Sequence, residues 1–159
     1  MKILAIDPGY ERLGIAIIEK QARQKEVLMH SECFKTSAKL PHAARLGLIK
    51  TRIEEVIAEF TPEKLAIETL FFSKNVKTAL LVSEARGAII ATATTAGLVT
   101  REFTPNEIKV AITSYGKSDK PAMMSMIPRL IKIKKDIKSD DEFDAIAVGL
   151  TYFAHHVTF

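Results

Sequence analysis

An apolar stretch near the N-terminus ends in an acid and a break in the chain, and it restricts the fold more than any other stretch. Residues 3–6 have the length and apolar character of a buried strand, Asp7 follows them, and Pro8-Gly9 then interrupts the extended backbone. A second apolar run occupies residues 14–18. The pattern predicts two antiparallel strands joined by a tight turn, with a carboxylate at the end of a central strand. Asp7 could instead only cap the turn, as Asp often does.

The rest of the chain alternates between strand and helix patterns. Apolar residues of strand character predict further strands at 27–34, 64–68 and 98–103. Helical spacing, caps and breakers predict helices at 41–60, at 76–96, from 105, at 121–133 with a break at Pro128, and from 139. Residues 113–120 read as a loop. The sequence therefore predicts the α/β class, with an antiparallel meander and parallel strands in one mixed five-stranded sheet that helices flank.

Two patterns predict capped helix starts. Thr104 precedes Pro105, and Glu107 follows at the third helical position, which is a capping box with proline in the first turn. Ser139 and Glu142 have the same capping-box spacing at the start of the final helix.

Composition limits the class of protein. The 159 residues are 47% hydrophobic and 26% charged, which fits a single folded domain over residues 1–159. The lone cysteine, Cys33, excludes an intramolecular disulfide and a zinc site built from cysteines. The longest uncharged run, residues 87–100, is shorter than the ~20 residues that span a bilayer. We expect a cytoplasmic protein without a membrane partner.

The positive charge is concentrated in one segment. The formal net charge is +4, and residues 101–139 contain nine Lys and Arg against four Asp and Glu. This segment predicts a polyanionic partner, although it could also be a solvated basic face.

Four acids have positions that predict a common site. Asp7 and Glu68 each end a predicted buried strand, and adjacent parallel strands bring such ends together. Asp141 and Asp144 are three residues apart and share one face at the start of the last helix. Clustered carboxylates repel unless cations compensate them, and oxygen ligands favour Mg²⁺ or Mn²⁺. Each acid also has a simpler interpretation. Glu68 could be a surface residue and Asp144 could be solvated. Asp141 could simply favour the helix N-terminus because of the helix dipole.

The sequence resembles the bacterial RuvC-type Holliday junction resolvases, which are endonucleases of the ribonuclease H-like superfamily. The resemblance covers essentially the whole chain and rests on five motifs in family order. They are Ile6-Asp-Pro-Gly9 with Gly14, Ala66-Ile-Glu68, Phe71 with Lys74-Asn75, Glu84-Ala-Arg-Gly87, and Asp141-x-x-Asp144-Ala-x-Ala147. The lysines of residues 132–138 exceed what the resemblance leads us to expect.

The resemblance implies roles for the four acids and for two lysines. Asp7, Glu68, Asp141 and Asp144 match the family's catalytic, metal-binding carboxylates, and Lys109 and Lys120 match its basic residues near the scissile phosphate. The chemistry that fits is phosphodiester hydrolysis with two Mg²⁺ ions roughly 3.5–4 Å apart, for which Mn²⁺ would substitute. Asp7 is the predicted bridging ligand. Either lysine could instead make a plain phosphate contact.

The resemblance also implies partners: four-way junction DNA, a second copy of the chain, and a branch-migration helicase complex. DNA contacts are predicted at Phe71, Lys74, Lys109, Lys117 and Lys120, with Phe72 expected in the core. Small residues at 87–93 could form the face between two copies, although a helix packed on its own sheet would look the same.

Other functions have a similar opening strand and turn. Actin-like ATPases need two domains around a nucleotide, which 159 residues cannot supply. A ribonuclease H-like nuclease that acts on RNA is an alternative. A junction-binding protein without catalysis is another, but the presence of all four acids argues against it.

Overall fold

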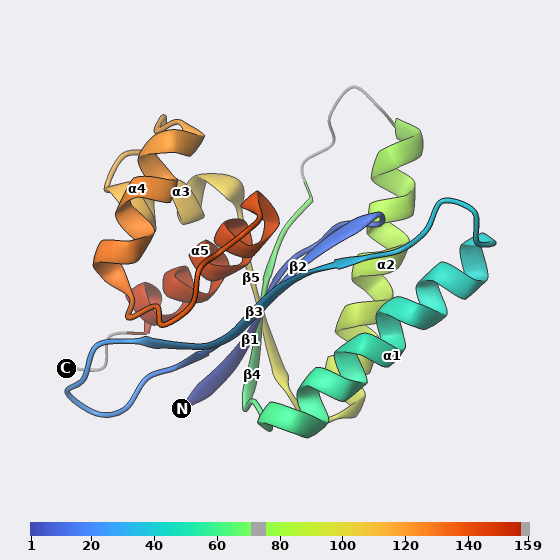
Figure 1. Ribbon diagram of the computed structural model, residues 1–159, viewed down its shortest axis with the longest axis horizontal. Coiled ribbons are helices and arrows are strands. Elements are labelled where there is room, and N and C mark those ends of the chain that lie inside the picture. Colours follow the sequence, from blue (N-terminus) through green and yellow to red (C-terminus); the bar gives the residue numbers. More distant parts are fainter. Residues whose placement is uncertain (71–75, 157–159) are drawn as a thin grey trace.

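The chain forms five strands and five helices in the described residues. The computed structural model describes residues 1–70 and 76–156 (Figure 1). The strands are β1 Lys2–Asp7, β2 Arg12–Glu19, β3 Val27–Lys35, β4 Lys64–Glu68 and β5 Val99–Phe103. The helices are α1 His42–Phe60, α2 Val76–Thr95, α3 Pro105–Thr113, α4 Lys120–Leu130 and α5 Asp140–His155. Each predicted strand and helix is therefore confirmed in type.

The five strands make one mixed sheet in the order β3-β2-β1-β4-β5. The pairs β1–β2 and β2–β3 are antiparallel, whereas β1–β4 and β4–β5 are parallel. This topology confirms the predicted meander followed by parallel strands. The parallel register aligns Ile6 with Ile67, so the C-terminal ends of β1 and β4 lie side by side.

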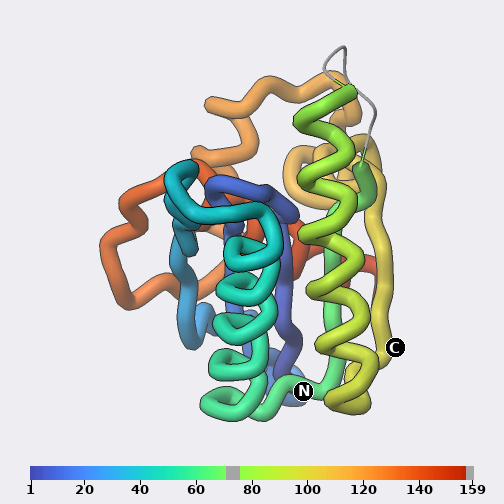
Figure 2. The backbone as a smooth tube through the Cα atoms, turned by 90° about the vertical axis from the view of Figure 1, so that its right-hand side faces the viewer, coloured from blue at the N-terminus to red at the C-terminus, as the bar shows by residue number. Residues whose placement is uncertain are grey.

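Alternation along the strands divides the core between two faces. Leu4 and Ile6 of β1 pack with α1 and α2, whereas Ile3 and Ala5 pack on the side of α5. Helices α1 and α2 cover one face and α3, α4 and α5 the other (Figure 1), and Figure 2 shows α1 and α2 side by side. Because successive side chains alternate, the acid that follows Ile6 faces α5.

Helix α5 docks closely on the central strands. Its residues 145–153 are all buried. A Cβ atom added at Gly149 would lie 2.6 Å from Ile18 Cδ1 and 3.0 Å from Ala5 Cβ. Glycine therefore permits an approach that a larger residue would prevent, and this approach packs the middle of α5 on the central strands.

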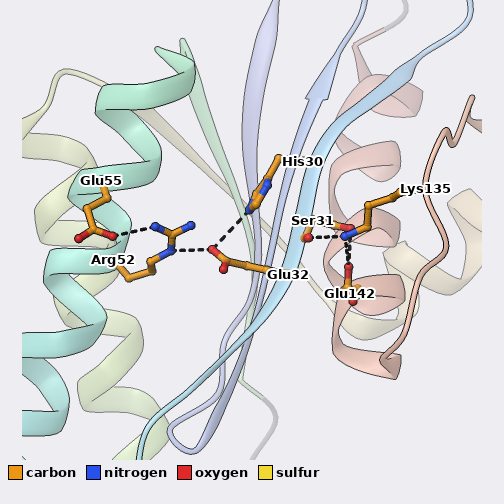
Figure 3. Close-up of polar contacts among 7 residues, drawn as sticks. All are labelled: His30, Ser31, Glu32, Arg52, Glu55, Lys135 and Glu142. Atoms are coloured by element: carbon orange, nitrogen blue, oxygen red, sulfur yellow. Dashed lines mark hydrogen bonds and ion pairs between the residues drawn. The ribbon is translucent and has the colours of Figure 1, made fainter.

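Strand β3 lies at the edge of the sheet and carries polar networks on both faces (Figure 3). Toward α1, Arg52 Nε donates to Glu32 Oε1 over 2.8 Å. Toward α5, Ser31 Oγ and Lys135 Nζ each donate over 2.6 Å to the buried Glu142 carboxylate. Burial opposes ionisation of Glu142, but Lys135 and Ser31 outweigh it and hold its pKa below the ordinary value.

Three predicted details of the helices differ from the structure. The capping box at Thr104 and Glu107 is complete, but the one at Ser139 is half formed, because Glu142 bonds to β3 and to Lys135 instead. The predicted break at Pro128 is wrong, since α4 continues to Leu130. Pro128 is exposed in the last turn, where its missing N–H removes only one helical bond. Lys120, predicted in a loop, is the first residue of α4.

We expect Lys135→Met to lower the free energy of unfolding by about 2 kcal/mol, because Glu142 would remain buried without its cationic partner. Urea denaturation measures the change. Lys134→Met is the matched control, since Lys134 is exposed and makes no ion pair among the described residues. It should change the free energy by less than about 0.5 kcal/mol. Equal effects of the two substitutions would contradict this role for Lys135.

Candidate active site

Asp7 and Glu68 meet at one end of the sheet, on the α5 side. Asp7 ends β1 and Glu68 ends β4, one residue beyond the aligned pair Ile6 and Ile67. The two side chains lie close enough for the charge of Glu68 to raise the pKa of Asp7. This arrangement places two carboxylates together as the sequence predicts.

The first turns of α5 bring the other two acids to the same place. Asp141 and Asp144 are close enough for their charges to act on Asp7. Gly14, the strand partner of Asp7, makes this approach possible. A Cβ atom at Gly14 would lie 2.2 Å from the Asp141 carbonyl oxygen and 3.1 Å from Asp7 Cβ. The structure thus brings all four predicted acids together.

Burial and mutual repulsion raise the pKa values of the two strand-end acids. For Asp7, burial is the largest cause, followed by the charges of Glu68, Asp144 and Asp141, and its pKa rises to about 8. Burial and then the charge of Asp144 raise the pKa of Glu68 to about 7. Such shifts mark carboxylates that lack enough positive charge nearby.

Two cationic side chains hold the acids of α5. Arg12 Nε donates to Asp141 Oδ2 over 3.0 Å, and Lys120 Nζ lies 2.9 Å from Asp144 Oδ2. Partial burial opposes ionisation of Asp141, but Arg12 and Cys33 outweigh it and lower its pKa. Burial raises the pKa of Asp144 in spite of Lys120.

A cleft runs past the acids between α3, α4 and the strand ends. One hollow of about 260 Å³ is lined by Glu68, Lys109, Lys120 and Asp144 among others. A second of about 240 Å³ contains Asp7, and the two share Glu68 and Pro105 as lining residues. The cleft therefore has acids on its floor and lysines on its α3 and α4 side.

The remaining predicted DNA contacts have different outcomes. Lys109 and Lys120 line the cleft, and Lys109 partly offsets the rise in the pKa of Glu68. Lys117 is exposed between α3 and α4 and does not line the cleft. Phe71, Phe72 and Lys74 lie outside the described residues.

Three residues at the site were not predicted from the sequence. Arg12 and Cys33 contact Asp141 from β2 and β3. Arg86 of α2 donates from Nε to the backbone carbonyl of Glu68 over 3.0 Å and pairs with Glu102, so it anchors the end of β4. In the sequence, only their positions inside the family motifs could have indicated the two arginines. Arg12 lies between Gly9 and Gly14, and Arg86 lies between Glu84 and Gly87.

The donor set fits an oxygen-ligated divalent cation. Four carboxylates converge, and burial raises the pKa values of three of them, Asp7, Glu68 and Asp144. Within residues 1–70 and 76–156, no three His, Cys, Asp or Glu side chains are yet arranged as the ligands of one ion. Asp141 and Asp144 are bonded to Arg12 and Lys120 instead. Binding of metal by all four acids would therefore require these two cations to give way.

We expect the free energy of unfolding to fall as pH rises from about 4 to about 8 in the presence of a chelator. The native state keeps a proton on Asp7 up to a pKa of about 8, whereas the unfolded chain loses it near 3.8. The native state therefore binds more protons over this range, and the sign of the slope is negative. Urea denaturation at both ends of the range measures it. Asp7→Asn should flatten the slope and Asp136→Asn, an exposed control, should leave it unchanged.

Comparison with known proteins identifies the family of this chain. The family model described as "Crossover junction endodeoxyribonuclease RuvC" matches residues 3–152. The chain belongs to the RuvC family. The relative from Halothermothrix orenii is 37% identical over 152 residues, which cover 96% of this chain and 92% of the relative. The relative from Heliobacterium modesticaldum is 39% identical over 158 residues, which cover 99% and 96%.

The fold comparison agrees with the family. A solved structure of T. thermophilus RuvC in complex with a Holliday junction substrate has a TM-score of 0.91 at 31% identity and covers 98% of this chain and 94% of its own. This likeness confirms the predicted ribonuclease H-like fold and the resemblance on which the functional expectations rest. In the described part of the chain, no helix has both the length and the apolar character needed to cross a bilayer.

Proposed function

We propose that this protein is a Mg²⁺-dependent endonuclease that resolves four-way DNA junctions by paired phosphodiester hydrolysis. The observation that carries the proposal is the convergence of Asp7, Glu68, Asp141 and Asp144 beside a cleft lined by Lys109 and Lys120. Membership of the RuvC family supports the substrate, because its members are named crossover junction endodeoxyribonucleases.

The residues of the site divide the work of hydrolysis. Asp7, Glu68, Asp144 and Asp141 would together hold the Mg²⁺ ions, with Asp7 as the central acid. Bound there, the ions would supply an activated water and neutralise the leaving 3′ oxygen. Arg86 holds the backbone of Glu68 and Arg12 holds Asp141, so both fix acid positions before substrate binds.

Lys120 has the reach to serve both the acids and the DNA. It bonds to Asp144 over 2.9 Å, approaches Asp140 within 3.3 Å and is exposed at the start of α4. From this position the Lys120 ammonium group would stabilise the negative charge that develops on the scissile phosphate.

We expect Lys120→Glu to slow junction cleavage at saturating DNA by about 10²–10³, because the reversed charge opposes the charge that develops on the phosphate. Single-turnover kinetics on a labelled junction measure the rate. Lys117→Glu makes the same change in charge outside the cleft and should alter affinity rather than this rate. An unchanged rate for Lys120→Glu would remove Lys120 from the site.

A second copy of the chain is the partner that paired incisions need, and α2 offers it a face. Ala85, Ile89 and Ala93 of α2 are buried in the core, so they are used within the fold. Gly87 and Leu80, in contrast, are exposed on α2. We assign the exposed side of α2 to the dimer. The branch-migration complex, the use of Mn²⁺ and a cytoplasmic location stay predictions.

The deciding experiment offers the protein three labelled substrates, with and without Mg²⁺: a four-way junction, a linear duplex and an RNA hairpin. We expect symmetric nicks in the junction alone, and only with Mg²⁺. Cleavage of the hairpin in preference to the junction would favour the RNA nuclease instead. Tight junction binding without cleavage at any Mg²⁺ concentration would identify a binding protein.

A further inference from the structure

The lysine-rich segment between α4 and α5, residues 131–138, runs along the open edge of β3. The Lys132 N–H donates to the Glu26 carbonyl over 2.9 Å, and the Leu28 N–H donates to the Lys132 carbonyl over 3.0 Å. Further along, Lys135 Nζ donates to the Ser31 carbonyl over 2.5 Å. The segment, which we call the edge segment, therefore follows β3 in parallel from its first residues toward the end that lies near the acids.

Alternation of residue types gives the edge segment an inner and an outer side. Its sequence is Ile-Lys-Ile-Lys-Lys-Asp-Ile-Lys. Ile131 is buried, and Ile133 and Ile137 pack against the core on the α5 side of the sheet. Lys132, Lys134 and Lys138 are exposed. The isoleucines thus hold the segment in place and turn three lysines outward, as the period of an extended chain requires.

The three outward lysines are free to meet an external anion. Lys135 is used within the protein, because it neutralises the buried Glu142. Among residues 1–70 and 76–156, Lys132, Lys134 and Lys138 make no ion pair with Asp or Glu. None of the three is therefore held by a carboxylate, in contrast to Lys135.

The edge segment leads directly to the active site. Ser139 follows it as the N-cap of α5, and Asp141 lies two residues further on. At about 3.3 Å per residue, the distance from Lys132 to Lys138 is at most about 20 Å, which corresponds to about six base-pair steps of duplex DNA. A duplex arm that leaves the catalytic acids along this edge would pass all three lysines.

We propose that Lys132, Lys134 and Lys138 bind the backbone phosphates of one junction arm along the β3 edge, outside the catalytic cleft. This inference rests on the proposed function and adds a second, sequence-independent contact surface to it. Lysines that neutralise phosphates supply affinity and register without reading bases. Lysines on a sheet edge can also serve only to prevent pairing with another sheet, and the experiment separates the two roles.

The test compares two triple variants that remove the same charge. The first is Lys132→Gln with Lys134→Gln and Lys138→Gln. The control is Lys2→Gln with Lys50→Gln and Lys64→Gln, which lie on α1 and at the starts of β1 and β4, opposite the acids. Fluorescence anisotropy measures binding to a labelled four-way junction in a chelator over a range of salt concentrations. Melting temperatures of both variants check that they fold.

We expect the edge variant to bind the junction about tenfold more weakly or worse at moderate salt. The slope of log affinity against log salt concentration should fall by about 2–3, since each lost phosphate contact removes about 0.9. The control should keep both values. At saturating protein, the edge variant should cleave the junction at the rate of the unmodified protein. If the proposed function itself is wrong, the unmodified protein will fail to cleave, so the two failures can be told apart.

Three results would overturn the proposal. Unchanged affinity and salt slope for the edge variant would exclude phosphate contacts. Equal losses in both triple variants would mean that only net charge matters. Aggregation of the edge variant with unchanged affinity would identify the lysines as protection of the sheet edge.

Discussion

Asp7→Asn is expected to abolish junction cleavage, with a loss of about 10³ or more, while junction binding survives. Asn has nearly the shape of Asp but lacks the negative charge that the proposed metal ligand needs. Junction binding depends on the lysines and should change little. Cleavage of a labelled junction and its binding in a chelator are measured side by side.

Asp136→Asn is the matched control for this change. Asp136 is exposed in the edge segment and lies outside the group of acids whose charges act on Asp7. It should cleave at the rate of the unmodified protein. Cleavage by Asp7→Asn at that same rate would remove the metal mechanism proposed for this site, whatever the control does.

Gly14→Ala is expected to reduce cleavage by about 10² or more although it changes no acid. The added methyl group would lie 2.2 Å from the Asp141 carbonyl oxygen, so α5 and its acids must move away from β1 and β2. Displacements of about 1 Å at a catalytic site reduce the rate by about 10². Single-turnover cleavage measures the loss, and the melting temperature should fall with it.

Gly47→Ala separates this effect from a general effect of replacing glycine. Gly47 lies inside α1, and nothing stands within 4 Å of a Cβ atom built there. Alanine favours a helix interior by about 0.5–1 kcal/mol over glycine, so this variant should be slightly more stable and fully active. Full activity in Gly14→Ala as well would show that α5 can shift without harm to the site.

Much of the site could be predicted because its acids follow local rules. Asp7 and Glu68 each end an apolar run, and the strand period alone places both on one face of the sheet. Asp141 and Asp144 are three residues apart on one helix. To predict that these acids meet, only the order of the strands must be known. The meander and the parallel units restrict that order to few possibilities.

The contacts that hold the acids could not be predicted, because they join residues far apart in the chain. Arg12 and Asp141 are separated by 129 residues, and nothing near either of them indicates the other. Arg86 reaches a backbone carbonyl, which any residue at position 68 would provide. Glu142 could have bonded to the backbone of Ser139, but its carboxylate bonds to the Lys135 ammonium group and the Ser31 hydroxyl instead.

The order of synthesis also matters for this site. Ribosomes make β1, β2 and β4 long before α5, yet α5 supplies two of the four acids and the inner surface that covers Ala5 and Ile18. A chain that still lacks α5 has an uncovered apolar sheet face and only two of the four acids. The proposed site therefore forms only after α5 has been made and has packed on the sheet.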